Sequence, residues 1–104
     1  MTLGTHRVIL RGRSKAIVWD PAKDRALLEE RGVGLRFAAE MIVNADYIAL
    51  VEHWNTIRYP HQWIFVLEIN AYAYYVPFVE TDEQIFLKTI IPSRKAKRRY
   101  LRGH

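Results

Sequence analysis

Residues 63–79 read WIFVLEINAYAYYVPFV, and this stretch decides the fold class. Residues 63–69 and 72–79 are rich in β-branched and aromatic side chains, which favours two strands. Asn70 and Ala71 stand between them, where a two-residue hairpin turn is expected. Asn tolerates a positive φ, and Ala tolerates it less well. Pro77 cannot donate a ladder hydrogen bond, so it predicts an edge position or a bulge in the second strand.

Two further strand patterns flank this hairpin. Residues 47–52 and 85–91 also consist largely of β-branched, aliphatic and aromatic residues. The polar residues 81–84, TDEQ, mark a reversal of the chain before the last of these strands. Short connections place consecutive strands side by side. The sequence therefore predicts a four-stranded antiparallel meander within residues 47–91.

Two helices are predicted before the meander. Asp20 offers a side-chain oxygen to the free N–H groups of a helix start, and Pro21 fits the first helical position. Apolar residues then recur at helical spacing up to Gly32, which favours a left-handed stop. Residues 35–43 carry a second apolar stripe at helical spacing, and Asn44 can end that helix.

The ends of the chain predict one more element each. Residues 6–11 and 16–19 alternate enough to form strands, with the turn at residues 12–14, although residues 1–5 equally fit a frayed end. Ser93 can begin a short helix whose Ala96, Tyr100 and Leu101 face the sheet. We therefore expect one α+β domain over residues 1–104. It combines a small antiparallel sheet, two N-terminal helices packed on one face and a short basic C-terminal helix. Residues 1–15 would form a basic strand or arm, and residues 16–104 the core.

The charge is distributed unevenly along the chain. The formal net charge is +5, yet residues 1–15 hold four Lys or Arg and no acid, and residues 88–104 hold seven and no acid. All eleven acids lie in the middle of the chain, beside five bases. Basic ends of this kind predict a polyanion partner, or an acidic protein that covers them.

Composition narrows the function classes. The chain has no cysteine, which excludes a disulfide framework, a thiolate metal site and a cysteine nucleophile. No stretch approaches the roughly 20 apolar residues that span a bilayer, and the N-terminus lacks a signal-peptide core. We expect a cytoplasmic protein without a membrane partner. No Gly-rich phosphate loop, nucleophile elbow or zinc-type His spacing is present, so neither a cofactor nor a metal is expected.

Three segments carry a family resemblance. Residues 17–33, IVWDPAKDRALLEERGV, and residues 90–101, IIPSRKAKRRYL, resemble the opening and closing motifs of the BrnT-like toxin family. A subgroup of that family also has similar meander residues, which here are His53, Asn55, Tyr59-Pro60, Gln62 and residues 76–96. The resemblance spans nearly the whole chain, from residue 17 to residue 101.

The resemblance implies a RelE/ParE-like α+β fold and an RNA-cleaving bacterial toxin. It also implies a cognate antitoxin that masks the toxin and binds promoter DNA, so that DNA is contacted only through the antitoxin. The sequence departs from the better-known members in two places. Those members tend to carry an arginine entering the third meander strand and another in the last. Here these places hold Trp63 or its neighbour and Lys88-Thr89, so catalytic roles do not transfer directly.

Cleavage of RNA without a metal needs a base for the 2′-OH proton, cations near the phosphoryl oxygens and an acid for the leaving 5′ oxygen. The candidates for these catalytic roles are Lys88, Arg94, His53 and Arg58. Lys88 shares a face with Phe86 in a period-2 strand, an apolar setting that suits a base or acid. The alternative for Lys88 is an edge lysine that discourages strand pairing. Arg94 follows a rigid Pro92 turn and offers a bidentate fork to a phosphate, or is solvated helix charge.

The loop EHWNTIRYPHQW, residues 52–63, holds the other two candidates. His53 can act as an acid or base near neutral pH or serve as a loop hydrogen bonder, and Arg58 can reach a phosphate. Trp54 and Tyr59 can stack on unpaired bases, or they can pin the loop to the sheet. The expected nucleic-acid-binding residues are the remaining cations of the C-terminal segment: Lys95, Lys97, Arg98, Arg99 and Arg102.

Three functions fit these features. The first is a metal-independent endoribonuclease toxin with RNA as its substrate and an antitoxin as its partner. The second is a non-catalytic nucleic-acid-binding module, because counterion release supports binding with or without cleavage. The third is a toxin that inhibits a protein target such as a topoisomerase.

Overall fold

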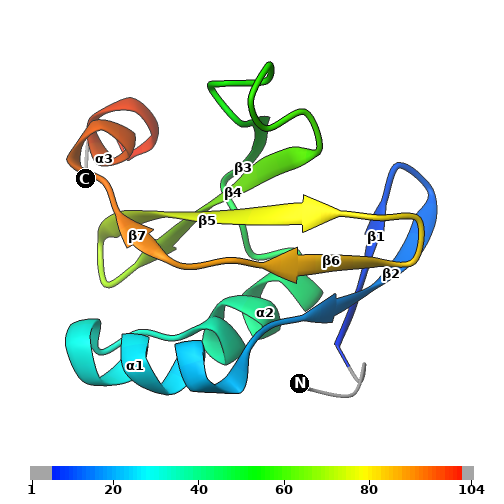
Figure 1. The fold of residues 1–104 in the computed structure, drawn as a ribbon. Helices are drawn as coiled ribbons and strands as arrows, with labels where there is room; N and C mark the ends of the chain where they lie inside the picture. The colour runs from blue at the N-terminus through cyan, green and yellow to red at the C-terminus, as the bar shows by residue number, and fades with distance from the viewer. Residues whose placement is uncertain (1–5, 102–104) are drawn as a thin grey trace.

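The computed structural model describes residues 6–101, which form a small α+β fold with a curled, mostly antiparallel sheet (Figure 1). The strands and helices follow in the order β1 (Arg7–Leu10), β2 (Arg13–Val18), α1 (Pro21–Arg31), α2 (Leu35–Val43), β3 (Ala49–Glu52), β4 (Gln62–Ile69), β5 (Tyr72–Glu80), β6 (Gln84–Leu87), β7 (Ile91–Pro92) and α3 (Arg94–Tyr100). The single strand expected over residues 85–91 is therefore two strands, β6 and β7.

The sheet order is β1-β2-β6-β5-β4-β3. The short strand β7 also pairs with β5, as β6 does. The pairs from β3 to β6 are antiparallel, as the meander pattern predicts. The pairing of β2 with β6 is parallel and was not expected. It joins the first hairpin to the end of the meander, so the basic N-terminal segment belongs to the sheet. The boundary placed after residue 15 lies inside β2.

The central hairpin turns at the two residues that the sequence indicated. Ile69 pairs with Tyr72, and the two residues between them have φ values of 53° for Asn70 and 62° for Ala71. Two consecutive positive φ values are typical of the type I′ turn, whose twist matches that of the strands. Ala71 pays a steric cost there, since its Cβ approaches the carbonyl oxygen that follows.

Pro77 lies opposite a bulge. β5 pairs with β4 on one side and with β6 and β7 on the other, so the edge position expected for Pro77 is wrong. Phe78 pairs with Leu87, and Tyr75 pairs with Ile91. Three steps along β5 thus match four steps along its partner, which leaves one extra residue between β6 and β7. The missing N–H of Pro77 falls where the ladder is already interrupted. A bulge therefore faces Pro77, but its extra residue lies in the partner segment and not in β5, where the sequence predicted it.

The first hairpin turns one residue earlier than expected. Leu10 pairs with Arg13, and the turn consists of Arg11 with φ 51° and Gly12 with φ 78°. The turn predicted at residues 12–14 is wrong because Arg11, a residue that rarely adopts positive φ, takes the first turn position. The side chain of Ser14 accepts a hydrogen bond from Arg7 Nε at 2.9 Å across the hairpin.

Two aspartates cap the helices α1 and α2. Asp20 precedes α1, and its carboxylate accepts a hydrogen bond from Ala22 N at 2.9 Å. The C-cap of α1 is Gly32, whose φ is 74°. α2 has no side-chain cap of its own at Gly34. Instead, Asp24 Oδ1 accepts a hydrogen bond from Leu35 N at 2.7 Å. A Cβ on Gly34 would overlap Asp24 Oδ1, so glycine is required for this approach.

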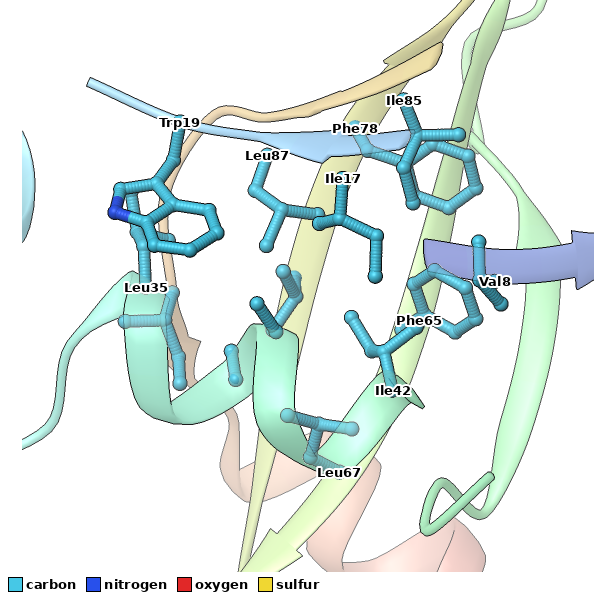
Figure 2. Packing of buried hydrophobic residues seen from close by; sticks show 14 of the residues in the cluster. Val8, Ile17, Trp19, Leu35, Ile42, Phe65, Leu67, Phe78, Ile85 and Leu87 are labelled. Atoms are coloured by element: carbon cyan, nitrogen blue, oxygen red, sulfur yellow. The ribbon is translucent and has the colours of Figure 1, made fainter. Parts of the chain in front are cut away.

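The core lies between the sheet and the helices α1 and α2 (Figure 2). Alternate residues of β4, Phe65 and Leu67, point into this cluster together with Ile42 of α2. Val66, between them, points to the opposite face, where it packs against Ala96 of α3. α3 therefore lies on the other side of the sheet from α1 and α2, as Figure 1 shows.

Candidate nucleic-acid interface

Helix α3 presents five cations on the side of the sheet away from α1 and α2. Ser93 Oγ accepts a hydrogen bond from Ala96 N at 3.0 Å and caps the helix, as expected from the sequence. Ala96 and Leu101 are buried against the sheet, and Tyr100 packs beside them. The predicted inner face is therefore confirmed. The cations on the remaining faces are Arg94, Lys95, Lys97, Arg98 and Arg99.

These cations divide between two sides of α3. On one side Arg94, Lys97 and Arg98 line a hollow of about 540 Å³ together with Tyr72 and Leu101, which we call the Tyr72 hollow. On the other side lies a hollow of about 240 Å³, which we call the Trp54 hollow. It is lined by the residues Val51, Glu52, Trp54, Ile64, Tyr75, Lys95, Arg99 and Tyr100.

No carboxylate neutralises the α3 cations within the described part of the chain. Among residues 6–101, the ion pairs involve Glu80 and Glu40, and neither contacts α3. Lys97 Nζ lies 5.1 Å from the ring centroid of Tyr72, and the Arg99 guanidinium lies 5.6 Å from the ring of Tyr100. These are contacts of a cation with an uncharged aromatic ring, so the positive charge of Lys97 and Arg99 is not neutralised by them.

Hydrogen bonds within the loop between β3 and β4 fix its shape. His53 Nδ1 accepts a hydrogen bond from Asn55 N at 3.0 Å, and Asn55 Oδ1 accepts one from Arg58 N at 3.1 Å. Tyr59 N donates to Asn55 O at 2.9 Å. The loop presents Trp54, which is 71% exposed, and Ile57, which is 94% exposed. It rises on the same side of the sheet as α3 (Figure 1).

His53 is the internal support of this loop. The residue is 9% exposed, and its ring lies between Trp54, at 4.3 Å between centroids, and Tyr59, at 4.6 Å. Because Nδ1 accepts a backbone N–H, this hydrogen bond requires the neutral tautomer with the proton on Nε2. The structure thus places His53 as a loop hydrogen bonder. Arg58 is exposed and lies over Tyr59, with 5.4 Å from guanidinium to ring centroid.

Lys88 stands in the bulge that faces Pro77. Its backbone N donates to Pro77 O at 2.9 Å, and its side chain is exposed. The apolar setting predicted for Lys88 is wrong, because β6 ends at Leu87 and the bulge breaks the alternation that would have continued to Ile90.

The four predicted catalytic residues do not share one hollow. The hollows beside α3 include Arg94 but not His53, Arg58 or Lys88. Of the predicted binding residues, Lys95 and Arg99 face the β3–β4 loop, and Lys97 and Arg98 face Tyr72. Arg102 lies outside the described residues.

Two carboxylates, Glu52 and Glu80, also line hollows of the structure. Glu52 lines the Trp54 hollow beside Lys95 and Arg99, and its place at a strand end was the only available signal. Glu80 pairs with Arg11 and, at 2.6 Å, with Lys15, which is 5% exposed. Burial raises the pKa of Glu80, but hydrogen bonds and charges of Lys15 and Arg11 outweigh burial, so this pKa lies below its usual value.

Comparisons of the whole chain with protein-family models, with curated proteins and with solved structures found no match. Within residues 6–101, no cluster of three His, Asp or Glu side chains is arranged to hold a metal ion. In the same described part of the chain, no helix is both long and apolar enough to cross a membrane.

Proposed function

We propose that the protein is a metal-independent endoribonuclease that binds single-stranded RNA in the Trp54 hollow. We further propose that it acts in the cytoplasm as the toxin of a bacterial toxin–antitoxin pair. One observation carries the RNA-binding part. An exposed tryptophan, a tyrosine and two cations that form no ion pair within residues 6–101 line the same hollow, namely Trp54, Tyr100, Lys95 and Arg99.

These residue types match what a single strand of RNA offers. A base can stack on the exposed face of Trp54, and such a contact contributes about 1–3 kcal/mol. Lys95 and Arg99 lie one helical turn apart on the same side of α3, a spacing suited to consecutive backbone phosphates. Arg94, Lys97 and Arg98, on the other side of α3, would hold the strand where it leaves the hollow.

The same hollow offers groups for cleavage. The Glu52 carboxylate can take the proton of a ribose 2′-OH as the 2′ oxygen attacks the phosphorus. Arg99 can offset the charge on the phosphoryl oxygens through its bidentate fork, and Lys95 or Tyr100 can protonate the 5′ oxygen as its bond to phosphorus breaks. The products would be a 2′,3′-cyclic phosphate and a 5′-hydroxyl end.

The toxin part of the proposal is supported by the two sequence motifs that resemble the BrnT-like family. The succession of α1, α2, the meander and the basic α3 supports a RelE/ParE-like arrangement. An acidic segment of a cognate antitoxin would cover the cations of α3, because no carboxylate in residues 6–101 pairs with them. Promoter DNA would be contacted only by that antitoxin.

The test combines induced expression with a purified reaction. RNA ends mapped after induction should show new 5′-hydroxyl ends, and the purified protein should cleave a labelled oligonucleotide in the presence of EDTA. Glu52→Gln should abolish cleavage and retain RNA binding, whereas Arg99→Gln should weaken both. Arg25→Gln, at an exposed position of α1 with the same charge change, is the matched control.

Two outcomes would overturn parts of the proposal. RNA binding without any cleavage by the unmodified protein would leave the non-catalytic binding module as the function. Toxicity that persists without new RNA ends would point to a protein target. Arg94→Ala is a further check, because it should reduce RNA binding while the fold stays intact.

A further inference from the structure

A third hollow lies against the first hairpin, away from α3. It measures about 430 Å³, within the size range of small-ligand sites. Three segments far apart in sequence meet there: the β1–β2 turn, the start of β4 and the residues that end β5. The residues that matter for its chemistry are Arg11, Arg13, Lys15, His61, Trp63 and Glu80. We call it the hairpin hollow.

The charges of the hairpin hollow are only partly neutralised from within. Glu80 is engaged by both Arg11 and Lys15. The other lining carboxylate, Asp82, is exposed and forms no ion pair within residues 6–101. Arg13 is also exposed and has no ion-pair partner in that part of the chain. The hollow therefore holds three cations against two carboxylates, with the imidazole of His61 beside them.

Lys15 has hydrogen-bonding capacity left over. Its ammonium donates to Thr81 O at 2.5 Å and pairs with Glu80 Oε2 at 2.6 Å. An ammonium has three N–H bonds, so these two acceptors leave one donor without a partner among residues 6–101. A buried donor without an acceptor costs about 1–3 kcal/mol. An acceptor supplied by a ligand in the hollow would remove this cost.

The depth of Lys15 selects the kind of anion. A phosphodiester inside a strand has two of its four oxygens tied to sugars, which limits its approach to a side chain that is only 6% exposed. A phosphate monoester has three free oxygens and can reach both Lys15 and Arg13. Trp63, which also lines the hollow, provides an aromatic wall, and the Arg11 guanidinium already lies 5.2 Å from its ring centroid.

We propose that the hairpin hollow binds the phosphate monoester of a nucleotide, with Lys15 and Arg13 on the phosphate and Trp63 and Arg11 beside the base. The source of this group is either a free nucleoside monophosphate or the 5′-phosphate end of an RNA. The proposal does not depend on RNA cleavage, because none of these residues lines the Trp54 hollow.

The test is a calorimetric titration of the full chain with adenosine 5′-monophosphate, with adenosine and inorganic phosphate as comparison ligands. The monophosphate should bind more tightly than either. Arg13→Gln should weaken its binding about tenfold, the usual effect of losing one charge-assisted hydrogen bond. Arg25→Gln makes the same charge change at an exposed position of α1 and should leave the affinity unchanged. Both variants are surface substitutions, so circular dichroism should show an unchanged fold.

Two oligonucleotides of one sequence distinguish the sources, one with a 5′-phosphate and one with a 5′-hydroxyl. Competition with the monophosphate by the first alone assigns the site to RNA ends. If neither competes, the site is for free nucleotides. The proposal is overturned if the monophosphate does not bind at about 1 mM, a weak-affinity limit. It is also overturned if adenosine binds equally well, or if Arg13→Gln and Arg25→Gln have equal effects. Lys95→Gln should leave this binding unchanged even if the proposed ribonuclease function fails.

Discussion

The ammonium of Lys15 and the carboxylate of Glu80 lie 2.6 Å apart and connect the first hairpin to the end of β5. Both side chains are nearly buried, and Arg11 is the only one of the three partners that is half exposed. Removing one member of such a pair leaves the other buried without compensation. The attachment of the basic N-terminal hairpin to the sheet therefore depends on this pair as well as on the β2–β6 pairing.

Stability should fall at acid pH because of Glu80. The pKa of Glu80 is lowered in the folded state, so the stabilisation is present above the unfolded pKa of about 4.3 and is lost as the pH falls through the folded value. Urea unfolding between about pH 6 and pH 3 should show this loss. In Glu80→Gln the slope below about pH 5 should be smaller. An identical slope in both proteins would contradict the assignment.

Glu80→Gln should also lower the free energy of unfolding at neutral pH, by about 3 kcal/mol, because Lys15 remains charged and buried. The double variant Lys15→Met/Glu80→Leu removes both charges and should be less destabilised than Glu80→Gln alone. Equilibrium unfolding of the two variants checks this order. The reverse order would show that the pair itself, not the unpaired charge, determines the loss.

Ala71→Gly should stabilise the protein by about 0.5–1 kcal/mol. The φ of Ala71 is 62°, a conformation that costs an L-residue about 1 kcal/mol and a glycine much less. Ala22→Gly is the matched control, since Ala22 is exposed in the first turn of α1 and glycine there should destabilise by up to about 1 kcal/mol. The midpoint temperature of thermal unfolding should therefore rise in Ala71→Gly and fall in Ala22→Gly. Shifts of equal sign would disprove the strain at the turn.

Asp24 and Gly34 should show coupled effects on stability. Asp24→Ala removes the acceptor of Leu35 N and should cost about 1 kcal/mol. Gly34→Ala should destabilise because the new Cβ overlaps Asp24 Oδ1 and comes within 2.9 Å of Leu28 Cγ. In the double variant the carboxylate is gone, so the loss should be smaller than the two single losses combined. Simple additivity would show that Leu28, not Asp24, is the obstacle.

Variants of Lys95 and Trp54 should separate the contributions of charge and of base stacking to the affinity for RNA. Lys95→Gln should weaken binding and reduce the dependence of the logarithm of affinity on the logarithm of salt concentration by about one phosphate contact. Trp54→Ala should weaken binding by about 1–3 kcal/mol and leave that dependence unchanged. Fluorescence anisotropy with a labelled oligonucleotide over a range of salt concentrations measures both quantities. Unchanged affinity in Trp54→Ala would remove the stacking platform from the proposed function.

Local signals in the sequence predicted local structure well. Asn70-Ala71, Asp20-Pro21 and Ser93 each determine a turn or a cap within a few residues, and the structure has those features at those positions. The turn at Arg11 was missed because a non-glycine residue occupies a position where glycine is usual. The parallel pairing of β2 with β6 joins segments far apart in the chain, and no local pattern reports such a contact.

The site was less predictable than the fold. The cations of α3 and their outward direction follow from helical spacing, but the side of the helix that faces Trp54 depends on tertiary packing. His53 has the residue type of a catalyst, yet its Nδ1 is engaged by the N–H of Asn55, a contact that depends on the loop conformation. Lys88 was expected in an apolar setting because strand alternation was extended across a bulge that only the pairing register shows.

The extra residue opposite Pro77 makes shortening and lengthening of this segment unequal in their effects. Lys88 is exposed and Thr89 half-buried, so most substitutions there should be tolerated by the fold. Deleting either residue would leave three steps on both strands between the Phe78–Leu87 and Tyr75–Ile91 pairs, so Ile91 would keep its partner and its face. An inserted residue would instead add a second unmatched position to the bulge. Insertions between β6 and β7 should therefore disturb the entry into α3 more than deletions do.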